Sequence, residues 1–548
     1  MKNIIKFLLF CTIIISGNSC SKKIDEAYQN PNAAVRVPVE SLLPQIISAM
    51  AGNYAGHGTM WDMRYIGAYI QNWQYYSTGS VFDQMGYTNS VGDVAQSTWR
   101  MHYYDIGQNN MQMIKWAAEE KKWDYVGVGK AIFAWSWLTL TDYYGDVILK
   151  EAFNTSLVTF KYDTQPEVYE YVKQLCFESL ENLNKTGDNA SPANLALGDA
   201  YFYKGDVNKW KKFVYGILAR YYNHQSNKAT YKPDSVIYYC NLSINNNADN
   251  AMVTFAGSAL SATNNFYGPL RGNLGLASTV SPTAIRQGSY IANLENGTNS
   301  AFPGIMDPRA WYMLRGNVNG TIVGIQPNKG QIILAANDRP ENFWGVSQVT
   351  ANNTAPATDA NCRYIFRNTS PFPIMTATEI KFMKAEAAFR KGDKSTAFTA
   401  YKEGINVNFD MLTTIFNVNI PAGKEITAAK KDAYIANASV VPATDAGLTL
   451  SKIMLQKYIG MFGYGILETW VDMRRYHYID PDPQTGTQVY TDFTPPSGGD
   501  LFADNNGKYV YRSRPRFNSE YVWNILELQR IGGTANDYHT LKMWFSEP

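Results

Sequence analysis

Apolar residues follow a helical spacing in two long parts of the chain, residues 41–240 and 371–478. Within the first part, residues 41–50 suit one helix, and residues 127–144 are apolar on nearly every side. A helix that is apolar all round is usually buried between neighbouring helices. Another helical stretch covers residues 450–476. The pattern therefore predicts a mainly α-helical protein with at least one helix enclosed in its core.

Two segments, residues 195–206 and 382–393, share the order helix, Gly-Asp turn, helix. In each of them a small residue, Gly198 or Ala385, stands seven positions before the turn glycine. Small residues allow two antiparallel helices to approach closely, and the glycine closes the turn, as in tetratricopeptide repeats. These segments predict a scaffold of tetratricopeptide-like helical pairs.

The character of the chain changes at residues 241–370 and again at residues 479–518. Small and polar residues dominate there, and no apolar period persists. Residues 321–325 and 331–334 are candidates for short strands. Because loop-rich regions of this length within a packed protein are usually functional, we expect them to form a binding region.

Residues 1–19 have the features of a bacterial lipoprotein signal peptide. Lys2 and Lys6 precede an apolar stretch at residues 7–15, which is shorter than the roughly 20 residues that span a bilayer. A small residue then directly precedes Cys20, as at a lipoprotein cleavage site. We expect Cys20 to be the lipidated N-terminus, residues 20–40 to form a tether, and residues 20–548 to form a single domain.

The charge balance excludes one large class of partners. Of the 49 basic residues, two lie in residues 1–19, so the remainder of the chain carries 47 basic and 47 acidic residues. A neutral chain lacks the basic surface that binds nucleic acid. Beyond Cys20 there are three further cysteines, Cys176, Cys240 and Cys362, which allow one disulfide at most and no thiol-based zinc site.

Motifs for catalysis and metal binding are weak. The five histidines lie too far apart for an HExxH motif, and neither a P-loop nor a GxSxG motif occurs. Residues 480–482 and 504–507 offer oxygen ligands of the calcium-loop type, but neither completes an EF-hand loop. Since Asp-Pro and Asn-Gly are ordinary turn sequences, we expect turns there, no cofactor and no metal site. A structural calcium ion is the alternative that these two segments leave open.

Several short motifs are spread in a characteristic order over the whole chain. They are LTLTDYYGDV at 138–147, YKGDVNKWKKF at 203–213, DPR at 307–309, the repeat pair at 375–405, the stretch 456–475 ending in WVDMRR, and RPR at 514–516. With the lipoprotein signal, this order resembles the SusD/RagB-like outer-membrane lipoproteins, most closely the SusD-like branch described as starch-binding and associating with the outer membrane.

The resemblance implies a fold, a location and an activity. The fold would be a tetratricopeptide-like helical scaffold with a large irregular loop region as its binding face. The protein would be lipid-anchored to the outer membrane and would face the cell surface. It would be no enzyme, but would capture a nutrient glycan and deliver it to a partner TonB-dependent transporter of the SusC-like type.

A sugar ring has an apolar face and a rim of hydroxyl groups, so its site needs a flat aromatic ring beside amides or charged groups. Residues 71–76 offer this mixture next to glycine-containing segments. The resemblance also places the N-terminal aromatic region and the central loops at the binding face. We predict ligand contacts from Asn72, Trp73, Tyr75, Tyr76, Tyr267, Arg271, Phe343 and Trp344.

Other aromatic and charged residues are assigned to the scaffold. Large aromatic residues on helices are mostly buried, so we place Trp135, Trp137 and Trp210 in the core. The group Asp472, Arg474 and Arg475 suits a structural polar cluster near a helix end. Two other functions stay open: the same architecture with an oligopeptide as cargo, and a surface glycoside hydrolase, since its two carboxylates can come from any part of a sequence.

Overall fold

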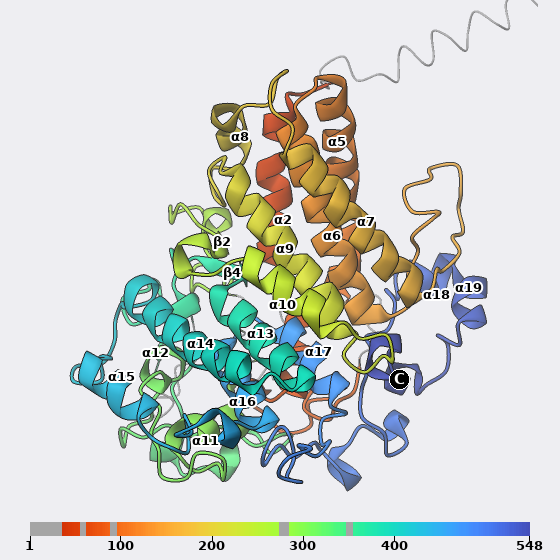
Figure 1. Ribbon diagram of the computed structural model, residues 1–548. Coiled ribbons are helices and arrows are strands. Elements are labelled where there is room, and N and C mark those ends of the chain that lie inside the picture. The colour runs from red at the N-terminus through yellow and green to blue at the C-terminus, as the bar shows by residue number, and fades with distance from the viewer. Residues whose placement is uncertain (1–35, 55–61, 88–95, 273, 275–283, 347–354) are drawn as a thin grey trace, which may run out of the picture.

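The computed structural model describes residues 36–54, 62–87, 96–272, 274, 284–346 and 355–548 (Figure 1). The predicted signal peptide, Cys20 and most of the tether lie outside the described residues. Within the described part of the chain, no helix combines the length and the apolar character that a membrane crossing requires.

Long helices that pack side by side form the N-terminal part of the molecule (Figure 1). The longest of them is buried nearly all round, as its apolar pattern predicts, and the core positions of Trp135, Trp137 and Trp210 are confirmed. The helices are α2 (Leu43–Tyr54), α3 (Asp62–Tyr69), α4 (Ser97–Arg100), the π-helical segment η2 (Met101–Gln108), α5 (Asn109–Glu119), α6 (Trp123–Tyr144), α7 (Gln165–Leu183), α8 (Pro192–Gly198), α9 (Val207–His224) and α10 (Pro233–Leu242).

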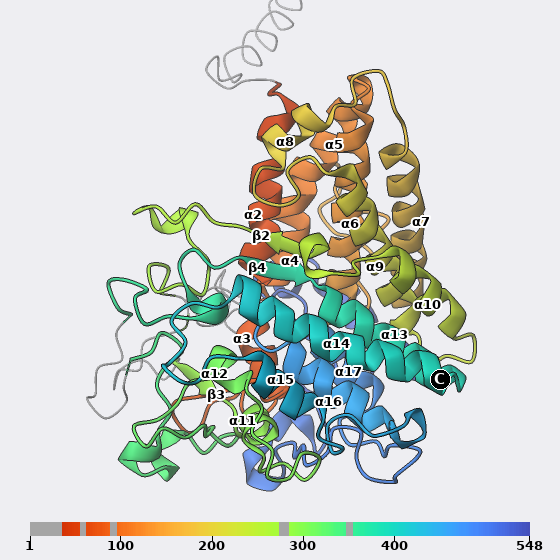
Figure 2. The ribbon, with the colours of Figure 1, turned by 60° about the vertical axis from the view of Figure 1, so that its left-hand side comes forward.

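The remaining helices continue this arrangement. α10 packs against α13, and α13 packs in turn against α14 and α16, so the scaffold runs on into the C-terminal part. The helices are α11 (Ser289–Asn296), α12 (Ala310–Met313), α13 (Ala377–Lys391), α14 (Lys394–Ile415), α15 (Ala428–Ile435), α16 (Leu450–Gly460), α17 (Ile466–Arg475), α18 (Glu520–Trp523) and α19 (Ile525–Arg530). The loops of the middle third of the chain gather to one side of these helices, on the left in Figure 2.

The second predicted repeat forms a helical pair as expected. Gly392 ends α13 with a φ of +89°, a backbone conformation that glycine adopts readily. Asp393 then caps α14 by accepting a hydrogen bond from the backbone N–H of Thr396. A Cβ atom at Gly404 would lie 2.9 Å from the ring of Phe382, so the small residue lets α13 and α14 pack closely.

The first predicted repeat is different, and the expected antiparallel pair is wrong there. α8 has seven residues and packs against α6 and the short helix η1 (Val39–Ser41). Gly198 accordingly faces Tyr125 and the backbone of Glu40 instead of α9. The turn itself is present, since Gly205 has a φ of +81° and Asp206 caps α9. The local turn chemistry was therefore readable, whereas the packing partner of the first helix was not.

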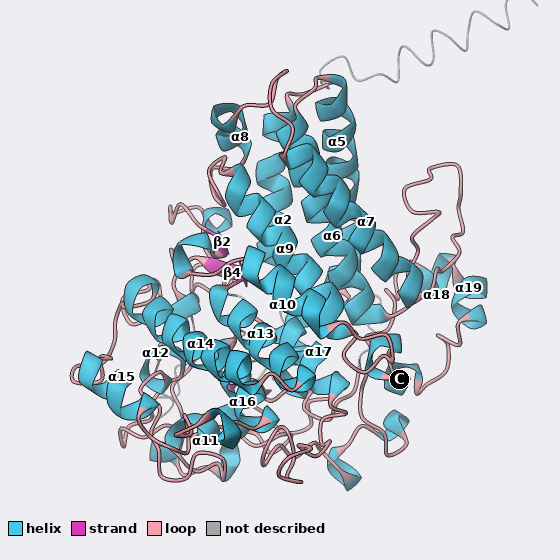
Figure 3. Ribbon diagram, viewed as in Figure 1, coloured by secondary structure: helices cyan, strands magenta, loops and turns pink. Residues whose placement is uncertain are grey.

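Strands are short and join distant parts of the chain (Figure 3). β1 (Trp73–Tyr75) pairs antiparallel with β3 (Ile285–Gln287), and β2 (Ala251–Val253) pairs antiparallel with β4 (Phe372–Met375). The strand predicted at 331–334 is wrong: a 3₁₀ helix (Gln331–Ile333) forms there. Residues 321–325 make only isolated bridges, from Ile322 and Ile325.

The three cysteines beyond Cys20 are buried in the described structure as free thiols. Burial raises the pKa of the thiols of Cys176, Cys240 and Cys362. They therefore contribute to packing as small apolar side chains.

Candidate ligand-binding groove

Six of the eight predicted ligand contacts are buried in this structure. The exposed fraction of each side chain is 3% or less, which leaves no ring face or amide for a ligand to reach. These six side chains are Asn72, Trp73, Tyr75, Tyr267, Phe343 and Trp344. Their placement gives them packing roles, and the site proposed below does not include them.

The structure does bring the two predicted regions together, but inside the core. The ring centroid of Trp73 lies 6.2 Å from that of Tyr267 and 6.3 Å from that of Phe343, both in edge-on contacts. The indole N–H of Trp344 donates to the carbonyl oxygen of Tyr267 at 2.8 Å. Asn72 accepts a hydrogen bond from the backbone N–H of Gly463. These residues therefore join the loop region to the helical scaffold.

The other two predicted contacts, Tyr76 and Arg271, are partly exposed. The guanidinium of Arg286 lies 5.6 Å from the ring centroid of Tyr76, and that of Arg271 lies 4.4 Å from the ring centroid of Phe266. Neither residue contributes to the groove described next, so ligand contact by these two stays a prediction.

A cavity of about 610 Å³ opens between α4, η2, the segment 148–160 and the start of α18. We call it the groove. Its lining residues are Trp99, Arg100, Tyr103, Tyr104, Gln108, Ile148, Ala152, Phe153, Asn154, Thr155, Leu157, Phe160, Arg516, Asn518, Ser519 and Glu520. An adjoining cavity of about 900 Å³ shares Ala152 and Phe153 with it. A mostly apolar cavity with a few polar groups is the usual form of a small-molecule site.

Aromatic rings form one side of the groove. Trp99 is buried, with its ring centroid 5.1 Å from that of Tyr103 and 5.2 Å from that of Tyr144, whereas 66% of Tyr104 is exposed. The guanidinium of Arg100 lies 5.3 Å from the centroid of the Tyr104 ring. Trp99 thus supports the wall, and Tyr104 offers a ring to solvent.

The floor of the groove contains a strained residue. Phe153 has a φ of +64°, which is rare for a residue with a bulky side chain. Its ring packs so closely on η2 that a Cβ atom at Gly107 would overlap it. Phe153 also lies 6.1 Å from the ring of Phe133. Strain of this kind persists only where the surrounding packing enforces it, so the floor has a defined shape.

Polar groups stand opposite the rings. Glu520 accepts hydrogen bonds from the hydroxyl of Tyr162 at 2.7 Å and from the amide of Asn524 at 2.9 Å. Burial raises the pKa of the Glu520 carboxyl. The side chain of Asn524 also bonds both backbone groups of Phe160. These bonds attach the segment 148–160 to α18 and keep the two sides of the groove together.

The sequence did contain a signal for this groove. Residues 99–104 read WRMHYY, the same mixture of rings and polar side chains that singled out residues 71–76. The two segments have similar compositions. They differ in burial, which composition alone does not show. β1 buries the earlier segment, whereas η2 carries Tyr104 at the surface.

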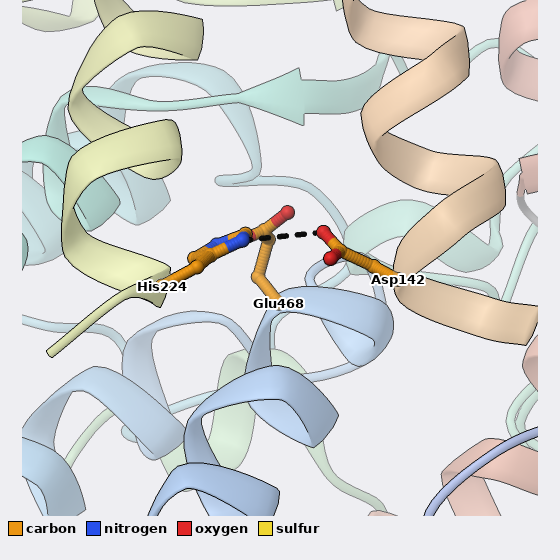
Figure 4. Close-up of side chains that lie close together, drawn as sticks. All are labelled: Asp142, His224 and Glu468. Atoms are coloured by element: carbon orange, nitrogen blue, oxygen red, sulfur yellow. Dashed lines mark hydrogen bonds and ion pairs between the residues drawn. The ribbon is translucent and has the colours of Figure 1, made fainter. Parts of the chain in front are cut away.

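A different cluster has metal-ligand residue types at its centre. Asp142, His224 and Glu468 come together from α6, α9 and α17 (Figure 4). Nδ1 of His224 lies 3.2 Å from Asp142, and Nε2 lies 2.9 Å from Glu468. The two ring nitrogens thus each face a different carboxylate. The arrangement instead suits an imidazolium held between two carboxylates.

The pKa of His224 agrees with its assignment as an imidazolium. Burial by itself lowers the pKa of His224, but the carboxylates of Asp142 and Glu468 outweigh it and raise the pKa to about 9. Glu468 also pairs with Arg220 at 3.1 Å, and Arg220 pairs with Glu379 at 2.6 Å. We call these five residues the charged junction. They join α6, α9, α13 and α17.

The predicted structural cluster on α17 is confirmed as a neighbouring group of ion pairs. Arg475 contacts Glu386 at 2.6 Å and Asp472 at 2.5 Å, and Lys457 lies 2.7 Å from Asp472. All of these side chains are buried. Arg474 donates to the backbone oxygens of Asp142 and Tyr511 instead.

The two segments with calcium-type ligands use their oxygens within the protein. Asp482 accepts hydrogen bonds from the backbone N–H groups of Ser451 and Gln484. Asp504 accepts one from the hydroxyl of Tyr87. Gly507 has a φ of +79°, as expected of a turn.

Comparisons with known proteins place this fold. Over residues 31–491 the chain matches the family described as starch-binding and associating with the outer membrane. A SusD/RagB family protein from Bacteroides thetaiotaomicron is 21% identical, with a TM-score of 0.64 over 93% of this chain and 99% of that chain. A SusD homologue from Bacteroides fragilis is 18% identical, with a TM-score of 0.64 over 93% and 100%. A chitin-binding protein is 20% identical, with a TM-score of 0.62 over 93% and 99%. No match was found among curated proteins.

The structural likenesses establish the fold, and the family match covers most of the chain. The helical scaffold, the loop-rich middle region and the order of the motifs agree with it. The chain therefore belongs to the SusD-like family of outer-membrane-associated, starch-binding proteins.

Proposed function

We propose that this protein is a non-catalytic lipoprotein that binds a glycan in the groove and delivers it to a TonB-dependent transporter of the SusC-like type. The observation that carries the proposal is the exposed ring of Tyr104 beside a mostly apolar cavity that also has a few polar lining groups. A ring of this kind can stack on the apolar face of a sugar, while Arg100, Gln108 and Asn154 can bond its hydroxyl groups.

The test is affinity electrophoresis through gels that contain different polysaccharides. We expect one glycan to retard the mature protein, and Tyr104→Ala to weaken binding about tenfold because the stacking surface is lost. Tyr238→Ala is the matched control, since Tyr238 on α10 is also exposed, at 59%, and lies outside the groove. Wild-type retardation of Tyr104→Ala would exclude the groove as the site.

The proposed partner and anchor need separate tests. A lipid on Cys20 would hold the protein at the outer membrane, facing the cell surface. We expect Cys20→Ala to move the protein from the membrane fraction to the soluble fraction. We also expect a large barrel protein to copurify from detergent, through an interface above about 2,000 Å². A membrane-extracted protein that is always isolated alone would contradict the partnership.

The charges around the groove support a binding role without hydrolysis. Glycoside hydrolysis needs two carboxyl groups on either side of the bond. In the described lining of the groove, Glu520 is the one carboxylate. The adjoining cavity has Glu167 and Glu170. The hydrogen bond from Lys150 lowers the pKa of Glu167. Partial burial would raise the pKa of Glu170, but hydrogen bonds from Lys173 and Tyr221 outweigh it and lower the pKa, so neither carboxyl suits a general acid. Release of reducing sugar from a polysaccharide panel would overturn this part of the proposal.

An oligopeptide is the alternative cargo that the sequence left open. A peptide site needs main-chain partners such as an unpaired strand edge. The described groove is lined by side chains of helices and irregular segments, which favours a glycan.

A further inference from the structure

A separate cavity of about 470 Å³ lies between residues 304–311, the loop at residues 423–424 and α15. It shares no lining residue with the groove. Its volume is within the range of small-molecule sites, roughly 300 to 1,000 Å³. We call it the lysine pocket, because Lys424 and Lys430 both line it.

Apolar side chains form one wall of the lysine pocket. Ile305, Met306 and Pro308 line it beside Trp311. Met306 is 40% exposed and Trp311 is 9% exposed, so part of this apolar wall is open to solvent. A ligand with an apolar body would cover that surface, and the gain is proportional to the apolar area removed from water.

Hydrogen bonds hold the opposite wall in place. The ammonium of Lys430 on α15 donates to the carbonyl oxygens of Gly423 at 2.7 Å and Glu425 at 2.8 Å. The backbone N–H of Ile426 donates to the hydroxyl of Tyr312 on α12 at 3.2 Å. The loop is thereby attached to both α15 and α12, so the pocket has its shape before any ligand binds.

The two lysines of the pocket are not neutralised by a direct partner. Nζ of Lys424 lies 4.3 Å from the ring centroid of Trp311, and neither Lys424 nor Lys430 forms an ion pair with a carboxylate of the described residues. Lys431, the next residue on α15, does pair with Asp410, at 2.7 Å. The pocket therefore differs in charge from the adjacent face of the same helix.

Carboxylates in the neighbouring segments leave this charge in place. As far as the structure describes the lining, it contains no acidic side chain. Asp307, which precedes the lining residue Pro308, is buried and pairs with Arg309 at 2.6 Å. Glu425 and Asp432 are exposed. The lining as a whole is thus positively charged, and an anionic ligand would complement it.

Donors for an anion are present beside the apolar wall. The indole N–H of Trp311 makes no hydrogen bond within the described ranges of the chain. An ammonium has three N–H groups, of which Lys430 uses two on the loop, and Lys424 uses none on a described acceptor. Together these groups can satisfy the two oxygens of one carboxylate.

We propose that the lysine pocket binds a small monocarboxylic acid, with the carboxylate paired to Lys424 and the apolar body against Met306 and Trp311. The inference goes beyond glycan capture and does not rest on it, because the two cavities share no residue and the ligands differ in class. The protein would then carry a site for a small amphipathic acid in addition to its groove.

Titration calorimetry on the mature chain with butyrate, hexanoate and hexanamide tests the proposal. We expect hexanoate to bind more tightly than butyrate, by about fourfold for each added methylene group. Hexanamide has nearly the same shape but no charge, so it should bind at least about tenfold more weakly than hexanoate.

A variant identifies the charge that is responsible. Lys424→Met keeps an apolar stem over Trp311 but removes the ammonium, so hexanoate should bind about tenfold more weakly and hexanamide should bind as it does to the wild type. Lys402→Met is the matched control. Lys402 also lies over an aromatic ring, 4.4 Å from the centroid of Phe398, but it stands on α14 outside the pocket.

Three results would overturn the proposal. They are the absence of hexanoate binding, equal affinities for hexanoate and hexanamide, and equal losses in Lys424→Met and Lys402→Met. The test is independent of the groove, because Tyr104→Ala should leave hexanoate binding unchanged and Lys424→Met should leave polysaccharide retardation unchanged.

Discussion

The charged junction and the groove both place polar side chains among aromatic rings, but those polar side chains are paired to different degrees. In the junction every charged side chain is 3% exposed or less and has an opposite charge within 3.2 Å. In the groove the acid paired with Arg100, Asp105, is 3.6 Å away, and Tyr104 is 66% exposed.

This difference distinguishes a structural cluster from a candidate ligand site. A buried charge is tolerated only with a partner, so a fully paired cluster has no capacity left for a ligand. An exposed ring with nearby donors that are only partly paired keeps that capacity. Residue types alone would have ranked the junction first, because it contains a histidine between two carboxylates. Because the charged groups of the junction are already paired with one another, the groove is the better candidate for a ligand site.

The largest effect is expected from breaking the junction. Arg220→Met removes the cation that neutralises both Glu379 and Glu468, and leaves two buried carboxylates without it. We expect the free energy of unfolding to fall by about 3 to 5 kcal/mol, as for other broken buried pairs. Chemical denaturation of the purified chain measures this.

An exposed ion pair provides the control for Arg220→Met. Lys391 pairs with Asp234 at the surface, where solvent screens the interaction. Lys391→Met should leave the denaturation midpoint within experimental error. If both variants lost the same stability, the junction would be no more important to the fold than a surface pair, and the comparison would fail.

The pH dependence of the free energy of unfolding gives a second test of the charged junction. His224 has a folded pKa of about 9, above its ordinary 6.5, so the folded state binds the proton more tightly than the unfolded state. The stabilisation is fully present below about pH 6.5 and is lost as the pH rises through 9. Its size is on the order of 3 kcal/mol.

A substitution identifies the source of that dependence. His224→Gln keeps a side chain that can hydrogen-bond but cannot carry the charge. Its unfolding free energy should therefore be lower than that of the wild type near pH 6 and should approach the wild-type value above pH 9. The same decline with pH in both proteins would assign the effect to another group.

Much of the scaffold was readable from the sequence because local rules decided it. The all-round apolar pattern predicted the burial of α6, and the Gly392–Asp393 turn predicted the α13–α14 pair. The motifs that carried the family resemblance include Asp142 and Glu468, which build the junction. Some of the residues that carry the family resemblance are therefore residues that hold the helices together.

The site was less readable because burial depends on pairing between distant segments. Trp73 and Tyr104 stand in segments of similar composition, yet β1 pairs with β3, more than 200 residues later, and so encloses Trp73. No local pattern predicts that pairing. The π-helical turn that exposes Tyr104 is equally invisible to a search for regular periods.

The shape of the groove floor can be changed by one methyl group. In Gly107→Ala the new methyl group would overlap the ring of Phe153 and would lie 2.6 Å from the backbone oxygen of His102, so both the ring and η2 must shift. Since Phe153 lines both adjoining cavities, we expect glycan retardation to weaken about tenfold. Gly499→Ala is the control, because a Cβ atom there meets nothing within 4 Å. Unchanged binding in Gly107→Ala would show that the ligand does not reach the floor.

The smallest effect is expected from Tyr104→Phe, which distinguishes the ring of Tyr104 from its hydroxyl. The Tyr104 hydroxyl donates no hydrogen bond within the described part of the chain, and the ring beside Arg100 is unchanged by the substitution. If stacking on the ring holds the glycan, Tyr104→Phe should bind within about twofold of the wild type, while Tyr104→Leu, which is apolar but not flat, should bind about as weakly as Tyr104→Ala. Equal losses in Tyr104→Phe and Tyr104→Ala would instead make the hydroxyl the contact. The groove would then hold its ligand by a hydrogen bond to Tyr104 instead of by stacking on the ring.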